Sequence, residues 1–267
     1  MHPALNIAIR AARAAGSSIL RYYNRLDTLT VDIKRQNDFV TEADQHAENE
    51  IIKVLRRAYP AHAILAEESG AHGDSDHCWI IDPLDGTTNF MHGLPHFAVS
   101  IGLQIRGHLE LAVIYDPIKQ ELFTAEKGGG ARLNDKRIRV GNRHNTEGAL
   151  FGTGFPFNTP GAMDFDAYLT TLKPIMANSA GIRRAGSAAL DLAYVACARL
   201  DGFWEFKLKP WDMAAGVLLI QEAGGIVTDD NGGENYLASG NVVGGNPKLH
   251  KWLLENIQNS RPVIKSK

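Results

Sequence analysis

The sequence predicts a mixed α/β protein in which layers of helix and sheet pack together. Three observations predict this fold class: apolar residues at helical spacing near the N-terminus, a series of β-like runs in the middle, and alternating strand and helix patterns in the second half. The chain has 267 residues, of which 44% are hydrophobic, so it can bury a sizeable core. We expect one compact unit over residues 1–267, with lobes at approximately 1–145 and 146–267.

Two amphipathic helices are expected at the N-terminal end. Across Ala4–Tyr23 the apolar residues recur every three or four positions, and the preceding Pro3 suits a first helical turn. A second helix should begin near Thr41, because Thr41 and Asp44 resemble a capping box, and it should stop at Pro60. The capping box would place Asp44 in the first turn of this helix.

The middle of the chain should form a sheet. Short β-like runs at Ala63–Ala66 and Trp79–Ile81 come first, and three longer runs follow, joined by short turns. The longer runs are Phe97–Ile105, Leu109–Tyr115 and Glu121–Ala125. Successive runs with tight connections are typical of an antiparallel meander.

The second half of the chain alternates between the two kinds of element. Strands are expected at Ala149–Thr153, Gly202–Phe206 and Asn241–Gly244. Helices are expected at Phe165–Met176, Ser187–Arg199, Trp211–Ala223 and Lys248–Ile257, with Gly224 and Gly225 closing the third of them. The chain shows no repeat with a period of tens of residues, so it is not a repeat array.

Charge and hydropathy exclude some partners. The 28 basic and 30 acidic residues give a formal net charge of −2, which does not favour strong autonomous binding to nucleic acid or to an anionic membrane. The apolar runs are far shorter than the roughly 20 residues of a membrane span, and the N-terminus lacks a signal-peptide pattern. We therefore expect a cytoplasmic protein, in which the widely separated Cys78 and Cys197 are reduced core thiols.

The segment Asp82–Thr88 is the first candidate for chemistry. An apolar strand delivers two carboxylates three residues apart, and Pro83 restricts Asp82 to extended geometry, so Asp82 and Asp85 can converge with the Leu84 carbonyl at a rigid corner. An all-oxygen site of this kind favours Mg²⁺ or Ca²⁺ over zinc. Taken alone, however, Asp-Pro and Asp-Gly steps are more often simple turns.

Other acidic positions extend this candidate site. Glu67 and Glu68 close the run at Ala63–Ala66, and Asp212 begins a strong helix after Trp211. Each also has a plain structural interpretation, as a solvated loop pair or as a helix cap. The residues Gly86, Thr87 and Thr88 follow Asp85 and could offer backbone N–H groups to a phosphate.

Three ordered motifs carry a resemblance to a known family. They are Leu65–Ser69, Trp79–Phe90 and Trp211–Gly216, the last followed by Glu222–Gly225. In these motifs, and over nearly its whole length, the chain resembles the inositol monophosphatase family, close to its bacterial SuhB-type branch. The resemblance implies a layered α/β/α/β/α sandwich with mixed, largely antiparallel sheets.

The resemblance also assigns roles to individual residues. It implies a site for two or three Mg²⁺ ions formed by Glu67, Asp82, the Leu84 carbonyl, Asp85 and Asp212. It implies that phosphate lies on Gly86, Thr87 and Thr88, and that Asp85, Gly186, Ser187, Ala188 and Glu205 bind the alcohol part of the substrate. Glu67, Thr87 and Asp44 would act in catalysis, with Asp44 and Thr87 positioning the attacking water.

The expected activity is Mg²⁺-dependent hydrolysis of small phosphate monoesters, with myo-inositol monophosphate as the first candidate substrate and with sensitivity to lithium. Phe155–Pro156 and Lys209–Pro210 depart from the pattern of the animal enzymes, which leaves the alcohol open. The alternatives are a sugar-bisphosphate or nucleotide phosphatase, and a SuhB-like regulatory protein that binds the transcription machinery. We expect a homodimer, and Arg183–Arg184 are either solvated charges or interface residues.

Overall fold

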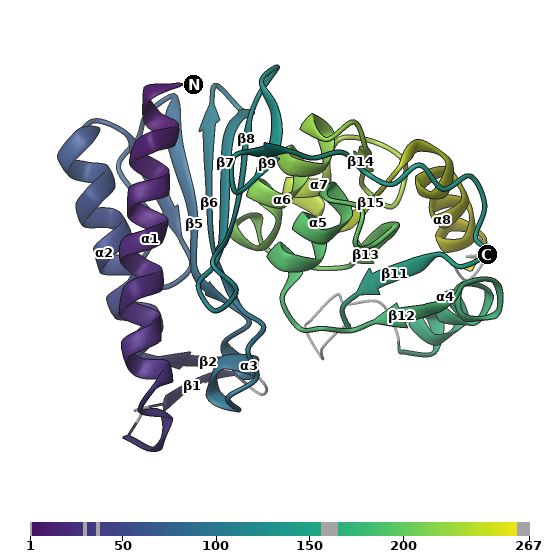
Figure 1. Cartoon of the computed structure of the whole chain (residues 1–267), viewed down its shortest axis with the longest axis horizontal. Helices are drawn as coiled ribbons and strands as arrows, with labels where there is room; N and C mark the ends of the chain where they lie inside the picture. The colour runs from purple at the N-terminus through teal and green to yellow at the C-terminus, as the bar shows by residue number, and fades with distance from the viewer. Residues whose placement is uncertain (1, 29–30, 36–37, 156–164, 261–267) are drawn as a thin grey trace, which may run out of the picture.

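The computed structural model describes residues 2–28, 31–35, 38–155 and 165–260 of the chain. Figure 1 shows five layers: a helix pair, a large sheet, a second helix pair, a smaller sheet and a third helix pair. In that order the helix pairs are α1 (Pro3–Tyr23) and α2 (Glu42–Ala58), α5 (Ala188–Ala196) and α6 (Pro210–Glu222), and α4 (Phe165–Asn178) and α8 (Pro247–Asn259). The predicted α/β/α/β/α sandwich is therefore confirmed.

The outer helices α1 and α2 form as the sequence predicts. Pro3 occupies the first turn of α1, and the helix buries a face of small residues that lets it lie close to α2 and to the large sheet. At α2 the capping box is present: the Thr41 hydroxyl accepts the Ala43 N–H at 3.1 Å, and the Asp44 carboxylate accepts the Thr41 N–H at 2.8 Å. Asp44 therefore fixes where α2 begins.

The large sheet contains the predicted meander. Its strand order is β10-β9-β8-β7-β6-β5-β3-β4, and all neighbouring pairs are antiparallel except β3 with β5. The strands are β3 (Ala63–Ala66), β4 (Gly70–His72), β5 (His77–Asp85), β6 (Ala98–Ile105), β7 (His108–Asp116), β8 (Glu121–Glu126), β9 (Gly130–Leu133) and β10 (Lys136–Arg137). The short helix α3 (Thr87–Met91) follows β5 directly.

The smaller sheet is mixed. Its order is β12-β11-β13-β15-β14, with β11 parallel to both of its neighbours and the remaining pairs antiparallel. The strands are β11 (Leu150–Thr153), β12 (Gly181–Arg183), β13 (Gly202–Glu205), β14 (Ile226–Thr228) and β15 (Val242–Gly245). A separate hairpin of β1 (Val31–Arg35) and β2 (Asp38–Thr41), a 3₁₀ turn at Leu26–Thr28 and the short helix α7 (Tyr236–Ser239) complete the described elements.

Helices α5 and α6 form the middle layer and pack against both sheets. Their buried residues join one cluster with Ala112 and Phe123 of the large sheet and Phe203 and Val242 of the smaller sheet. Helix α5 ends at Ala196, three residues before the predicted end at Arg199, because Ala198 adopts a left-handed conformation with φ of 63°. The middle layer thus connects segments that lie far apart in the sequence.

Neither cysteine forms a disulfide. Cys78 lies in β5 and Cys197 caps the C-terminal end of α5, and both are half-buried, with burial raising the pKa of each thiol. Among the described residues, no helix is both long enough and apolar enough to cross a bilayer.

Candidate active site

Parallel pairing of β3 with β5 brings Glu67 beside Asp82. Ala66 lies opposite Ile81 in the register, and the Glu67 N–H donates to the Ile81 carbonyl oxygen at 3.1 Å. Parallel strands end at the same edge of a sheet. Both acidic residues therefore emerge at that edge, although 15 positions separate them in the sequence.

A corner at the end of β5 separates Asp82 from Asp85. The pairing of β5 with β6 shifts register between these two residues, where Pro83 has no N–H to donate to a neighbouring strand. Oδ1 of Asp82 accepts the Leu84 N–H at 2.9 Å, and Asp82 itself is only 2% exposed. The rigid corner predicted from the Asp-Pro-Leu-Asp order is therefore present.

Asp85 is held by the start of α5. Its Oδ2 accepts the Ser187 hydroxyl at 2.5 Å and the Ala189 N–H at 2.7 Å, and Ser187 is the N-cap of that helix. Burial raises the pKa of Asp85 to about 6, while the hydrogen bonds from Ser187, Ala189 and Ala188 lower it in part. Asp85 therefore connects the end of β5 to the start of α5.

Asp212 comes from the start of α6. It is the third residue of the helix, and its Oδ2 accepts the Lys209 N–H at 2.6 Å. The Ser100 hydroxyl of β6 donates to the Trp211 carbonyl oxygen at 3.2 Å, which fixes the helix start against the large sheet. Asp212 thus caps its helix and also supplies charge to the acidic cluster.

Glu67, Asp82, Asp85 and Asp212 form one acidic cluster. Burial raises the pKa of Asp82 well above its usual range, and the charges of Glu67, Asp85 and Asp212 raise it further. Burial and the Asp85 charge likewise raise the pKa of Asp212, against the lowering effect of the Lys209 N–H. The charged residues that alter the pKa of Asp82 are all acidic, so this cluster would be stabilised by a cation.

The donor chemistry of this cluster fits Mg²⁺. Carboxylate and carbonyl oxygens are the ligands that this ion prefers, and a bound divalent cation would favour the charged forms of Asp82 and Asp212, whose pKa values are raised by burial and by neighbouring carboxylates. In the part of the chain that the structure describes, no three acidic, histidine or cysteine side chains are already arranged to hold a metal ion. The fit therefore rests on oxygen donors and on charge, and the ligand roles of individual residues stay predictions.

Thr87 and Asp44 meet as the sequence analysis expected. Oγ1 of Thr87 lies 3.0 Å from Oδ1 of Asp44 and 3.1 Å from the Leu84 carbonyl oxygen. Oδ2 of Asp44 accepts both the N–H and the hydroxyl of Thr41, and Asp44 is fully buried. Because a hydroxyl has one proton and two lone pairs, Thr87 can still accept a hydrogen bond from water.

Gly86 permits the turn from β5 into α3. Its φ is +99°, and a Cβ at this position would lie 3.0 Å from the His96 carbonyl oxygen and 3.2 Å from that of Gly186. The N–H groups at Thr87 and Thr88 then begin a helix of only five residues. Thr88 is exposed, and its hydroxyl makes no hydrogen bond with another described residue. Individual N–H groups, rather than a long helix dipole, are what this segment offers an anion.

Glu205 is the last residue of β13 and lies against Gly154. A methyl group on Gly154 would occupy the position of the Glu205 carboxyl group, so the two residues are in close contact. Burial raises the pKa of Glu205 to about 8, and the charge of Asp191 raises it further while Arg184 lowers it. At neutral pH Glu205 can therefore donate as well as accept a hydrogen bond.

Arg184 and Phe155 lie against each other near Gly186. The Arg184 guanidinium lies 5.1 Å from the centre of the Phe155 ring, and its Nη1 would be 2.9 Å from a Cβ at Gly186. Pro156, which the sequence analysis paired with Phe155, lies outside the described residues. Arg183 and Arg184 are both exposed. The charge of Arg184 lowers the pKa values of the buried Asp191 and of Glu205, and Arg183 has no such effect, so the two residues are not equivalent.

Sequence reasoning missed two residues that hold the site together. Glu48 is 3% exposed and accepts the N–H groups of Glu68 and Ser69, each at 2.9 Å, so it fixes the turn that carries Glu67. Asn89 donates to the carbonyl oxygens of His96 at 2.8 Å and Ala185 at 2.9 Å, which ties α3 to the substrate side. The available signal for Glu48 was an acidic residue four positions after Asp44, on the same helix face.

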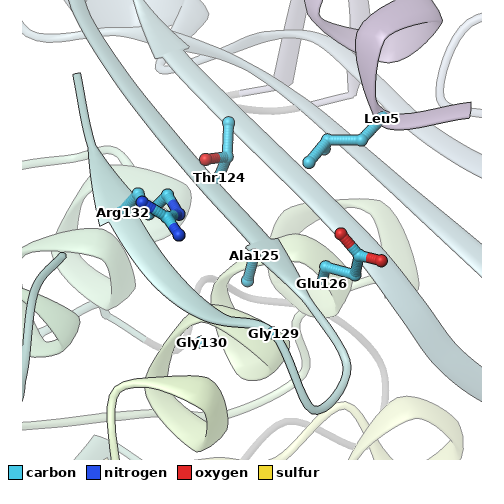
Figure 2. A pocket seen from close by; sticks show the side chains of 7 residues that line it. All are labelled: Leu5, Thr124, Ala125, Glu126, Gly129, Gly130 and Arg132. Atoms are coloured by element: carbon cyan, nitrogen blue, oxygen red, sulfur yellow. The ribbon is translucent and has the colours of Figure 1, made fainter. Parts of the chain in front are cut away.

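A pocket elsewhere on the surface is separate from this cluster. Figure 2 shows it between the start of α1 and strands β8 and β9, with a volume of about 220 Å³. Its charged side chains are Glu126 and Arg132, and Glu126 also accepts the His2 N–H at 3.0 Å. None of the predicted site residues lines it, so it is not the candidate active site.

Comparison with known proteins agrees with the motifs. Residues 1–261 match the profile of the inositol monophosphatase family. A protein named Nus factor SuhB, from Pseudomonas aeruginosa, is 54% identical over 266 residues, which cover 98% of this chain and 98% of that protein.

Solved structures agree as well. The extragenic suppressor protein suhB from Bartonella henselae has a TM-score of 0.93 and 47% identity, over 96% of this chain and 99% of that chain. Inositol monophosphatase from Anabaena (Nostoc) has a TM-score of 0.85 and 40% identity, over 97% of this chain and 96% of that chain. The likeness in each case extends over almost the whole fold, including both sheets and the middle helices.

Proposed function

The chain belongs to the inositol monophosphatase family, and from this membership we propose that it catalyses Mg²⁺-dependent hydrolysis of small phosphate monoesters, with myo-inositol monophosphate as the first substrate. One observation carries the proposal. Burial and the charges of neighbouring carboxylates raise the pKa values of Asp82 and Asp212, beside Gly86–Thr88 and the Thr87–Asp44 pair. This combination suits a cation and an anion bound side by side.

Under this proposal Glu67, Asp82, the Leu84 carbonyl, Asp85 and Asp212 hold Mg²⁺. When bound, Mg²⁺ supplies positive charge to the phosphoryl oxygens and makes water a stronger nucleophile. The N–H groups of Gly86, Thr87 and Thr88 orient the phosphate. Hydrolysis of a phosphate monoester depends mainly on positioning and on charge stabilisation, because the transition state has little covalent character for a protein group to share.

Thr87 and Asp44 orient the attacking water. The Thr87 hydroxyl donates toward Asp44, 3.0 Å away, which leaves its oxygen as an acceptor for a proton of the water. Because Asp44 is fully buried and accepts two further hydrogen bonds from Thr41, the Thr87 side chain has a fixed direction. This arrangement positions the water without needing Asp44 to contact it.

Asp85 and Glu205 bind the alcohol part of the substrate. Asp85 is anchored by Ser187 and Ala189, so it can accept a substrate hydroxyl from a fixed position. Glu205, with a pKa raised to about 8, can donate a hydrogen bond to a substrate oxygen at neutral pH. Gly186 and Ala188 add small residues beside them, which suits a compact polyol.

Phosphate release from myo-inositol monophosphate, with Mg²⁺ and with a chelator, tests this function. Asp82→Asn removes a charge with little change in volume, and we expect phosphate release to fall by about a hundredfold or more. The exposed Asp74→Asn is the matched control and should leave turnover unchanged. Undiminished turnover in Asp82→Asn would contradict the proposal. The same assay measures inhibition by lithium and compares fructose 1,6-bisphosphate and nucleotide monophosphates as alternative substrates.

A second candidate function is a regulatory role through binding to the transcription machinery. It is supported by 54% identity to a protein named Nus factor SuhB across 98% of the chain. A pull-down with purified RNA polymerase and its elongation factors tests it, using the wild type and Asp82→Asn. Binding that survives Asp82→Asn would show that the interaction is independent of hydrolysis, and no binding in either form would exclude this role.

We also propose a cytoplasmic homodimer, which size determination in solution can check.

A further inference from the structure

The outermost helix layer carries a strong positive charge. Helices α1 and α2 lie at one end of the layered fold, with their outer side facing away from the large sheet (Figure 1). Helix α1 contains no acidic residue, and in α2 Asp44 and Glu48 are buried, which leaves Glu42 and Glu50 as the partly exposed acids. The exposed basic residues on the two helices are Arg10, Arg13, Arg21, Lys53, Arg56 and Arg57. This surface is basic although the chain as a whole has a net charge of −2.

A groove of about 410 Å³ lies between these two helices. Its lining combines an aliphatic floor with a basic rim. The floor is formed by the half-buried Ile7 and Val54, and the rim by the exposed Arg10, Lys53, Arg57 and Ala58. A single acidic residue, Glu50, also lines the groove.

The charges on the rim are not neutralised within the described part of the chain. Neither Arg10 nor Arg57 makes a hydrogen bond, an ion pair or a ring contact with another described residue. Lys53 lies 3.8 Å from Glu50, but its side chain is 76% exposed, so solvent screens that pair strongly. Two guanidinium groups therefore remain able to form bidentate contacts with carboxylates.

We propose that this groove binds an acidic, amphipathic helical segment of a protein partner. The apolar residues of the segment would lie on Ile7 and Val54, and its carboxylates would contact Arg10, Lys53 and Arg57. This is the mode in which an amphipathic helix lies in a surface groove with apolar anchors at helical spacing. The interaction is separate from the proposed phosphatase activity, because none of the predicted site residues lines the groove.

The lining favours a protein over other anionic partners. Single-stranded nucleic acid binds most firmly where bases can stack on aromatic side chains, and the groove lining contains no aromatic residue. A membrane-binding surface needs large apolar side chains that protrude beyond the charges. The exposed large apolar side chains among the described residues lie outside α1 and α2. An aliphatic floor below a basic rim therefore matches an acidic segment with apolar anchors.

Fluorescence anisotropy with the full-length chain tests the proposal. The probes are two labelled peptides of identical composition, rich in Glu and Leu, one with Leu at helical spacing and one scrambled. We expect the patterned peptide to bind at least about tenfold more tightly than the scrambled one. Combined Arg10→Glu and Arg57→Glu should weaken binding of the patterned peptide by about tenfold or more, mainly at low salt.

Matched variants distinguish the effect of charges that line the groove from the effect of the protein's overall charge. Lys248→Glu with Lys251→Glu reverses two exposed charges on α8 and should change binding less than about twofold. Val54→Ser should weaken binding through loss of the apolar floor, and thermal unfolding with phosphate release confirms that each variant is folded. Equal binding of the two peptides, or equal effects of the two charge reversals, would overturn the proposal. Tighter, Arg10- and Arg57-dependent binding of a single-stranded RNA oligonucleotide or of phosphatidylserine vesicles would overturn it in favour of that partner.

Discussion

Thr87 connects three parts of the molecule through one oxygen atom. Its hydroxyl lies within hydrogen-bonding distance of Asp44 in α2 and of the Leu84 carbonyl in β5, while its backbone begins α3. A side chain that is fixed in this way can orient water with little loss of conformational entropy during the reaction.

Replacing Thr87 should therefore show whether this residue positions the attacking water or binds the substrate. We expect Thr87→Val to lower kcat by about 10²- to 10⁴-fold with a much smaller change in KM, because the isosteric side chain cannot accept a hydrogen bond from water. Thr87→Ser retains the hydroxyl and should keep most of the activity. Steady-state kinetics with saturating Mg²⁺ measure both values. A loss of activity as large in Thr87→Ser as in Thr87→Val would contradict this role.

Glu205 should make the stability of the metal-free protein depend on pH. Its pKa is 4.5 in an ordinary environment and about 8 in the folded state. Between these values the folded chain holds a proton that the unfolded chain has lost, so the free energy of unfolding falls as pH rises toward 8. Since one pKa unit corresponds to about 1.4 kcal/mol, the contribution amounts to a few kcal/mol.

Glu205→Gln should flatten this part of the profile. Urea unfolding in the presence of a chelator, at pH values from 5 to about 8, measures the difference. The exposed Glu234→Gln serves as control and should follow the wild type. A Glu205→Gln profile as steep as that of the wild type would show that another group carries the pH dependence.

The sequence was informative about the residues of the proposed site and less so about those that support them. Asp82, Asp85 and Thr87 could be singled out because a strand end, a proline and a glycine stand together within one short segment. Glu48 could not be distinguished from a solvated helix charge, since its contacts are with backbone N–H groups about 20 residues away. Asn89 donates to the carbonyl oxygens of Ala185 and Gly186, which lie 96 and 97 positions further along the chain. No local sequence pattern indicates a contact between segments so far apart.

At the scale of elements, α2 supports the site at two levels. Asp44 in its first turn holds Thr87, and Glu48 one turn later holds the loop that carries Glu67. The two acids lie on the same face of the helix because they are four residues apart. A shift of α2 would therefore move both Glu67, the predicted metal ligand, and Thr87, the residue proposed to orient water.

Glu48→Ala should show this dependence. Loss of the carboxylate leaves the N–H groups of Glu68 and Ser69 without their acceptor, which we expect to cost about 1–3 kcal/mol of stability. The Mg²⁺ concentration for half-maximal phosphate release should rise, because Glu67 is no longer held in place. Chemical denaturation and Mg²⁺ titration measure these effects, with the exposed Asn49→Ala as control. An unchanged Mg²⁺ requirement would mean that the loop holds Glu67 without Glu48.

Long elements could be predicted and very short ones could not. The helices α1, α2 and α8 have clear apolar periodicity, whereas α6 is a continuous apolar run that follows a distinct start signal. The predicted ranges of all four agree closely with the structure. Strands β12 and β14 contain three residues each, too few to show an alternating pattern. They form because neighbouring strands β11 and β15 offer hydrogen-bonding partners, which is a property of the folded sheet.

At the scale of the whole molecule, the packing of the middle layer determines whether the two sheets unfold together. Gly216 of α6 lies against Leu192 of α5, where an added Cβ would be 2.5 Å from the Leu192 Cβ. Gly102 of β6 likewise leaves room for Ala214, at 3.3 Å from an added Cβ. Small residues thus allow α6 to approach both its partner helix and the large sheet.

Gly216→Ala should destabilise both sheets together. Overpacking of this kind costs about 1–3 kcal/mol, and a shared middle layer spreads the effect across the fold. Trp79 in the large sheet and Trp204 in the smaller sheet provide separate fluorescence probes when the other tryptophans are replaced by phenylalanine. We expect the two probes to report the same lowered midpoint of unfolding. Different midpoints would show that the predicted lobes at 1–145 and 146–267 unfold independently.

Asp44 and Asp212 share a property that bears on how such a protein can diverge. Each is the third residue of its helix and accepts the N–H of the residue that precedes that helix. A descendant that lost the proposed hydrolysis and kept only the proposed binding of a partner would still need these two acids to begin α2 and α6. Glu67 begins no helix and would be under no such constraint. Loss of catalysis during evolution should therefore be recorded at the strand ends, while the acids that start helices persist.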